Sequence, residues 1–250
     1  MLSLGTGSSP AISDMANQTF YTFDGSDQSI DPHADVVTTI ANAVTASSIE
    51  FSISAWFKID TVSASRVLFK LFRNGNSQNQ ILVIYHASSN EMRFNAKFAN
   101  TSDLIQQGTN SIEGDGNWHH IVGTCSSQDD TTEMWIDGSK IGSVSGVGTP
   151  DVTFDTVAIC NNGAGGGFWD GSVDSLAIYT RQLTDTEIAK IYEAGAGGLD
   201  LVSAAHVDPT GLVLLHRFEE KSGTVCINEA GQNSSYRNSP TVVEHNGAFS

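Results

Sequence analysis

The chain has 250 residues, of which 39% are hydrophobic and only 16% are charged, and its formal net charge is -16. Such an acidic field repels phosphate backbones, and no cluster of Lys and Arg offsets it, so nucleic acid is excluded as an expected partner. No run of 18 apolar residues occurs, so neither a membrane-spanning helix nor a membrane partner is expected.

Residues 1–18 are rich in Ser, Gly and Asn and show no hydrophobic period. The pattern predicts an N-terminal arm that attaches to a partner. The segment also lacks the basic region and apolar stretch of a secretory signal peptide. We therefore expect the protein to fold in a cytoplasm.

From Phe20 onward, short apolar runs follow one another with Gly, Asn and Ser between them, which is typical of strands joined by tight turns. Such runs cover residues 51–59, 66–72, 81–86, 92–98 and 118–125. The fold class predicted is all-β, with two antiparallel sheets packed as a sandwich.

Residues 116–138 predict a hairpin that ends in an Asp137-Gly138 turn. In the first strand, alternation places His119 and His120 on opposite faces, so the two rings cannot share a metal. We interpret them as core or cross-strand hydrogen-bonding residues.

One short helix is predicted near residues 184–194. Thr184 and Glu187 form a capping box, apolar residues follow at helical spacing, and Gly195 is positioned to end the helix in a left-handed conformation. Residues 196–210 are rich in Gly and Ala and are interpreted as a linker.

Cys125, Cys160 and Cys226 lie far apart without the spacing of a metal site. Their odd number argues against a closed disulfide framework. We expect small, buried thiols.

Five motifs together indicate a family. They are Phe23-Asp24-Gly25, residues 51–57, residues 116–138, residues 168–174 and residues 184–188. In this order they resemble the laminin-G-like jelly rolls of the concanavalin A-like lectin/glucanase superfamily, of the kind found in virion proteins of tailed phages. The resemblance implies a jelly roll over residues 19–195.

Residues 211–250 resemble the opening strand and turn that precede the Phe-Asp-Gly motif in most members of this family. Three arrangements follow: a circularly permuted fold, a strand that completes a neighbouring subunit, or the start of a second module. A lone hairpin is marginal in water, so we expect this strand-and-turn segment to pack on its own sandwich or on a neighbour's.

Glycan hydrolysis requires two carboxylates that flank the scissile bond. The glutamates of the strand region, Glu50, Glu91, Glu113 and Glu133, stand singly. No enzymatic activity is therefore expected, and no cofactor is required.

Glycan binding requires aromatic rings beside polar loop groups. The loop Asn161–Gly167, followed by Trp169, is the best such sequence, with Trp169 as the stacking residue and Asn161 and Asn162 as polar partners. Its glycines would equally suit a bent strand. Carboxylates at turns are candidate ligands for calcium, and here the candidates are Asp24, Asp27 and Asp170.

The resemblance favours a non-enzymatic structural protein of the virion, either a capsid decoration or a head- or tail-associated jelly roll with possible adhesion to host-surface glycans. Capsid or tail subunits would be its partners, and a homo-oligomer such as a trimer is expected. The alternative is a free-standing carbohydrate-binding lectin module. A glycoside hydrolase is the third and weakest hypothesis.

Overall fold

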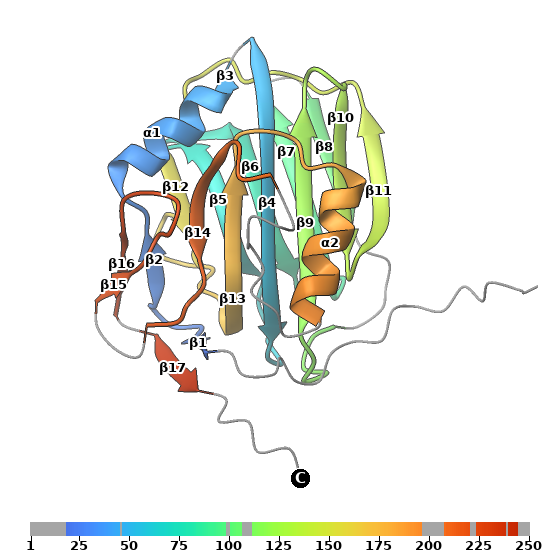
Figure 1. The fold of residues 1–250 in the computed structure, drawn as a ribbon. Helices are drawn as coiled ribbons and strands as arrows, with labels where there is room; N and C mark the ends of the chain where they lie inside the picture. The colour runs from blue at the N-terminus through green and yellow to red at the C-terminus, as the bar shows by residue number, and fades with distance from the viewer. Residues whose placement is uncertain are drawn as a thin grey trace, which may run out of the picture.

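The structure is a computed structural model, and it describes residues 19–45, 47–98, 101–106, 112–196, 208–220, 224–238 and 240–244. The predicted arm, residues 1–18, and most of the predicted linker lie outside the described residues. Two sheets stack face to face, with one helix at an edge of the sandwich and one on an outer face (Figure 1). Within the described ranges, no helix is long and apolar enough to cross a membrane.

The first sheet has nine strands in the order β11-β10-β9-β4-β13-β1-β17, with β14 also paired to β13 and β3 to β4. The bounds are β1 Thr19–Asp24, β3 Val44–Thr45, β4 Ser48–Ile59, β9 His119–Ser126, β10 Thr131–Ile136, β11 Ser139–Ser145, β13 Asp170–Tyr179, β14 Leu212–His216 and β17 Thr241–Glu244. The pairings between these strands are antiparallel.

The second sheet has eight strands in the order β15-β16-β2-β12-β5-β6-β7-β8. The bounds are β2 Ser29–Asp31, β5 Arg66–Arg73, β6 Asn76–His86, β7 Glu91–Phe98, β8 Thr101–Gln106, β12 Thr156–Ile159, β15 Val225–Cys226 and β16 Ser234–Arg237. The predicted all-β, two-sheet antiparallel jelly-roll sandwich is confirmed.

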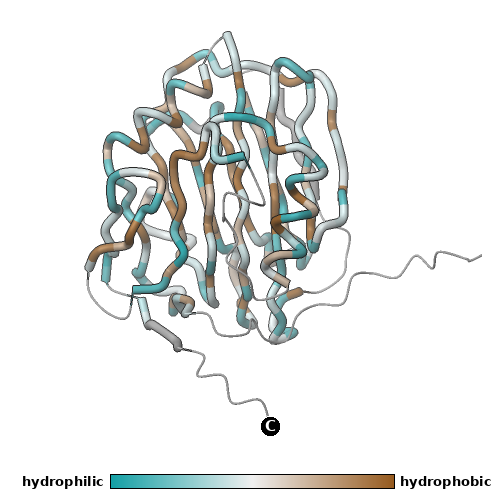
Figure 2. The backbone as a smooth tube through the Cα atoms, in the orientation of Figure 1, coloured by the Kyte–Doolittle hydropathy of each residue, from teal (hydrophilic) through white to brown (hydrophobic). Residues whose placement is uncertain are grey.

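The core lies between the two sheets and follows from strand alternation. On β4, Phe51, Ile53, Ala55 and Phe57 all point into it and are at most 1% exposed. Successive residues of a strand face opposite sides, so each strand offers one such row. Figure 2 shows the resulting mixture of hydrophobic and hydrophilic positions along the strands.

The predicted hairpin is confirmed. β9 pairs with β10 in an unbroken antiparallel register. Asp137 and Gly138 then connect β10 to β11 with φ angles of 49° and 71°. Positive φ at both positions is what a tight turn between two strands requires, which explains why Asp-Gly stands there.

The predicted helix is confirmed as α2, Asp185–Ala196. Its capping box forms as expected: Thr184 N donates to Glu187 Oε2 at 2.9 Å, and Glu187 N donates to Thr184 Oγ1 at 3.3 Å. The predicted end is wrong, because the helix continues through Gly195 to Ala196. Gly195 is buried within the last turn of the helix.

The prediction of one helix is incomplete, because a second helix, α1 Ala34–Ala43, covers one edge of the sandwich (Figure 1). Its five consecutive β-branched residues favour strand, so propensity gave no helical signal. Val36 and Ile40, one turn apart, are buried in the core, and this packing stabilises the helix. The ring of His33 caps its start by accepting from Asp35 N at 3.2 Å.

Strands from the C-terminal segment join both sheets. In the first sheet, β14 pairs with β13 and β17 with β1; in the second, β16 pairs with β2. Leu214, Phe218 and Cys226 from this segment are fully buried in the core. The described part of the segment therefore packs on the sandwich of its own chain.

All three cysteines are buried and unbridged, as predicted. Burial raises the pKa of the Cys160 thiol well above its ordinary value. These residues therefore pack as small hydrophobic groups.

Candidate functional site: the glycine-rich loop and the face beside it

The loop between β12 and β13, residues 160–169, is shaped by its two asparagines. Asn161 Oδ1 accepts from Gly163 N at 2.6 Å, and Asn162 Oδ1 accepts from Ala164 N at 2.8 Å and from Gly166 N at 3.1 Å. Asn161 is 8% exposed, and its amide nitrogen donates to Ile159 O. Asn161 is therefore mainly a scaffold of the loop.

Asn162 differs from Asn161 in one respect. The structure gives its side-chain nitrogen no hydrogen-bond partner among the described residues, and the side chain is partly exposed. The loop therefore carries two side-chain N–H donors from which a ligand could accept hydrogen bonds.

Gly163 allows the loop to lie flat on the second sheet. A Cβ at this position would stand 2.3 Å from Cζ of Phe72, and the residue has a φ of 75°. Both close approach and positive φ require glycine here. The glycines of this loop accordingly serve backbone geometry.

The prediction that Trp169 is an exposed stacking residue is wrong, because its ring is 0% exposed and packs edge-on against Phe57 with ring centroids 5.8 Å apart. Its backbone N–H donates to Cys160 O across the loop, which fixes this inward orientation. The preceding residue, Phe168, is partly exposed instead.

Phe168 lines a small cavity of about 150 Å³ at the edge of the second sheet. The walls come from β2, β12, β16 and the glycine-rich loop, and the polar lining residues are Ser29, Asp31, Thr156, Asn161 and Arg237. A concave site with one aromatic ring and a few convergent polar groups is typical of small-ligand binding. We call this cavity, with Lys70 and Asn162 beside it, the loop-face site.

Two arginines support the loop-face site. Arg237 Nη2 pairs with Asp31 Oδ2 at 3.0 Å on the rim, where both side chains are exposed. Arg66 Nη1 donates to Phe168 O and Gly25 O, and its Nη2 pairs with Asp170 at 3.1 Å. Arg66 therefore ties the loop to the turn after β1.

The solvent-facing side of β5 continues the site beyond the cavity. Phe69 and Leu71 point into the core, so Lys70 points outward, next to Ala158 of the cavity wall. Its Nζ lies 4.3 Å from the ring centroid of Phe72 and 3.5 Å from Asn162 O. Burial lowers the pKa of Lys70 from its ordinary value.

The structure brings together two of the three calcium candidates. Asp24 and Asp170 are opposite each other across β1 and β13, but Arg66 pairs with Asp170. Burial raises the pKa of Asp170, and Asp60 and Asp24 raise it further, against the effect of Arg66. Within the described ranges, no group of three or more His, Cys, Asp and Glu residues is arranged to hold a metal. Calcium binding stays a prediction that nothing here tests.

The two histidines of β9 lie on opposite faces, as predicted. His119 bonds to Asp137 at 2.8 Å and to Asp115 at 3.0 Å, and His120 Nε2 bonds to Ser54 Oγ at 2.8 Å. Burial lowers the pKa of His119, but the two carboxylates outweigh burial and leave it raised. Burial lowers the pKa of His120 to about 4. Both rings form hydrogen bonds that connect β9 to neighbouring segments.

Sequence reasoning found the loop but missed Phe168, Asp31, Arg237 and Lys70. Lys70 carried a usable signal, since it interrupts an apolar run that reads as a buried strand. Asp31 and Arg237 carried none, because they are 206 positions apart and meet only through the pairing of β2 with β16.

The family model of the concanavalin A-like lectin/glucanases superfamily matches residues 31–189, well over half of the chain. The chain belongs to this superfamily. A comparison with curated proteins found no match.

Solved structures share the fold at low sequence identity. A candidate carbohydrate-binding protein of Bacteroides ovatus is 13% identical with a TM-score of 0.60; the alignment covers 92% of this chain and 61% of that one. The CBM40 module of a Ruminococcus gnavus sialidase, solved with α2,3-sialyllactose, is 10% identical with a TM-score of 0.56, and the alignment covers 70% of this chain and 97% of that module. A pentraxin of Limulus polyphemus is 14% identical with a TM-score of 0.57, and the alignment covers 93% of this chain and 97% of the pentraxin. These likenesses show that the chain shares the jelly-roll fold of these proteins.

Proposed function

We propose that the protein is a glycan-binding module without hydrolase activity, and that it binds at the loop-face site. The observation that carries the proposal is the convergence of Phe168 and the Asp31–Arg237 pair around one cavity, with the Asn162 amide in the adjoining loop. An aromatic ring offers a face to the C–H surface of a sugar, while the polar groups offer donors and acceptors to its hydroxyls. The small volume of the cavity suits one sugar unit, and the remaining units of the glycan would lie over the solvent-facing side of β5.

The carboxylates at the site support binding without cleavage. Asp31 is the one acidic residue that lines the cavity among the described residues, and it is paired with Arg237. Hydrolysis by two carboxylates needs a second acid on the other side of the scissile bond. A bound glycan is therefore expected to be recovered intact after incubation with the protein.

A glycan array followed by titration calorimetry with the best ligand tests this proposal. Phe168→Ala is expected to weaken binding about tenfold or more, which corresponds to roughly 1.4 kcal/mol. Ile141→Ala, which removes a 36% exposed apolar side chain from β11 in the other sheet, is the matched control and should bind normally. Unchanged binding by Phe168→Ala would refute the assigned site.

Placement of this module on a virus particle, with capsid or tail subunits as partners, stays a prediction from the sequence. Co-sedimentation of the chain with particles would test it. Loss of co-sedimentation on deleting residues 1–18 would support the anchoring role of the arm, and retention would contradict it.

A further inference from the structure

The strands beside the cavity carry a charge opposite to that of the whole molecule. Of the 12 Lys and Arg residues in the chain, five lie on β5 and β7, whereas these strands and β6 between them carry only one of the 28 Asp and Glu residues. On a chain with a net charge of -16, this part of the second sheet is locally basic. It would attract an anion that the rest of the surface repels.

The basic residues on the outer side of this region differ in their partners. Arg93 is paired with a carboxylate, since its Nε donates to Glu91 Oε1 at 2.8 Å. Lys70 has no such pair: within the described residues, no carboxylate lies within 4 Å of its Nζ. Its neighbours across the sheet are Ala158 and Leu82. Its one hydrogen bond, to a backbone carbonyl, is long at 3.5 Å.

Lys70 is also held in place. The ring of Phe72 lies beneath its ammonium group, and the loop lies against the same ring through Gly163. A partly buried cation without a counterion is unfavourable, and the lowered pKa of Lys70 reflects that cost. An anion at this point would offset the cost and gain a charge-assisted hydrogen bond.

We propose that the glycan bound at the loop-face site carries an anionic group, a carboxylate or a sulfate, and that Lys70 recognises it. This inference rests on the proposed function and specifies its ligand class. The sugar ring occupies the cavity beside Phe168, and the anionic group lies one strand away, over β5, since Ala158 of the cavity wall is the register partner of Lys70.

Pairs of glycans that differ only in the charged group provide the test. Sialyllactose is compared with its neutral carboxamide for the carboxylate, and sulfated lactose is compared with lactose for the sulfate, by titration calorimetry on the full chain. The charged member is expected to bind about tenfold or more tightly, since a hydrogen bond to a charged group contributes roughly 1.5–3 kcal/mol. Whichever charged member gains affinity identifies the group. Equal affinity for charged and neutral members would overturn the inference.

Variants assign the effect to Lys70. Lys70→Met keeps the aliphatic stem over Phe72 and should remove the preference for the charged member over the neutral member. Lys70→Arg should retain the preference. Lys190→Met, on the exposed side of α2, changes the net charge equally and should have no effect. A preference that survives in Lys70→Met would refute the role of this residue.

A measurement without sugar separates this inference from the proposed function. Titration of inorganic sulfate, followed by NMR of the Lys70 side chain, should shift its resonances in the wild type and leave those of Lys190 unchanged. No shift of Lys70 would overturn the inference even if neutral glycans bind and Phe168→Ala abolishes that binding. A sulfate shift without any glycan binding would instead refute the proposed function.

Discussion

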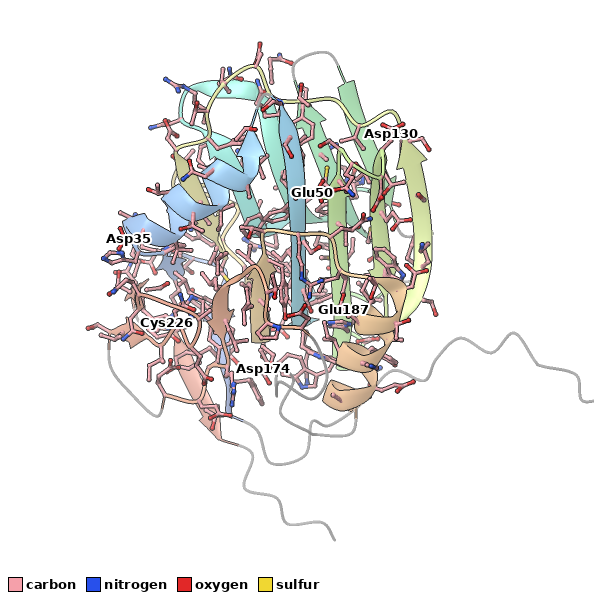
Figure 3. The ribbon with its side chains drawn as sticks, turned by 45° about the horizontal axis from the view of Figure 1, so that its top comes forward. Asp35, Glu50, Asp130, Asp174, Glu187 and Cys226 are labelled. Carbon is pink, nitrogen blue, oxygen red and sulfur yellow. The ribbon has the colours of Figure 1, made fainter. Side chains whose placement is uncertain are left out.

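At the scale of single residues, the outer side of the first sheet holds ionisable groups that burial keeps neutral. Asp174 of β13 is 1% exposed and lies opposite Trp56 of β4. Its Oδ1 accepts from Ser175 Oγ at 3.1 Å, but Oδ2 has no partner within the described residues. Figure 3 shows Asp174 enclosed among the side chains of the sandwich. Burial raises its pKa to about 8, and Glu219 contributes in the same direction.

A buried acid of this kind makes stability depend on pH. Because the pKa of Asp174 is raised from 3.8 to about 8 on folding, the folded state binds more protons than the unfolded state over that window. The contribution of Asp174 to the free energy of unfolding therefore decreases as pH rises through the window. Asp174→Asn removes the titrating group. The free energy of unfolding of the variant minus that of the wild type should therefore increase from about pH 5 to about pH 8, by on the order of a few kcal/mol.

Urea denaturation of both proteins at the two pH values measures this difference. Asp185→Asn, at a carboxylate whose side chain is 71% exposed, is the control and should show none of it. A constant difference in stability between Asp174→Asn and the wild type at the two pH values would contradict the assignment.

At the scale of elements, the features that the sequence predicts correctly are those whose signals are local. The Asp137-Gly138 turn and the Thr184/Glu187 capping box each depend on residues a few positions apart. The helix α1 has no such local support, because burial of Val36 and Ile40 outweighs the strand preference of its residues. The spacing of these two residues, one helical turn, was the available signal.

The orientation of Phe168 and Trp169 could not be predicted for a different reason. Two adjacent aromatic residues after a glycine give no indication of which points inward. Two interactions decide it: the register of β1 with β13, which places Asp24 opposite Asp170 and depends on a distant strand, and the bond from Trp169 N to Cys160 O across the loop. The same dependence on distant pairing applies to the Asp31–Arg237 pair.

The cap of α2 allows a quantitative prediction. Glu187 also pairs with Arg181 at 2.7 Å, and although burial raises its pKa, the bonds from Arg181 and Thr184 lower it to about 2. Thr184→Ala removes the capping hydroxyl and should lower the free energy of unfolding by about 1 kcal/mol. Thermal unfolding followed by circular dichroism measures the change.

Two variants control for other effects of that substitution. Thr184→Ser keeps the hydroxyl and should stay close to the wild type. Thr186→Ala changes an exposed threonine inside the helix and should not destabilise it, since alanine is the better helix former. Equal destabilisation by Thr184→Ser and Thr184→Ala would show that the cap is not the cause.

At the scale of the whole molecule, the C-terminal segment acts as part of the sandwich and not as an appendage. It supplies strands to both sheets, and Leu214 of β14 is fully buried in the shared core. In Figure 2, β14 is among the most hydrophobic stretches of the tube. A chain that lacked this segment would expose the core surface that Leu214 and Phe218 cover.

We therefore expect a chain truncated after residue 210 to lose cooperative unfolding. Within the full chain, Leu214→Ala should lower the free energy of unfolding by about 2–5 kcal/mol, the usual cost of such a cavity. Val225→Ala, in the same segment but 48% exposed, should change stability by less than about 0.5 kcal/mol. Denaturant titration measures both variants. A truncated chain that unfolds with wild-type cooperativity would show that the segment is dispensable.

The pairing of β1 with β17 determines how the molecule responds to mechanical tension. Thr19, at the start of β1, lies opposite Glu244, at the end of β17. A load applied between these two residues acts along the interstrand hydrogen bonds, which run perpendicular to antiparallel strands, and so breaks them one after another. The four-residue edge strand β17 would peel away first, while β1 stays paired with β13. Tension across the two ends would thus extend the chain in steps, and β16, which precedes β17 in the chain, would separate from β2 of the second sheet after β17 has been released.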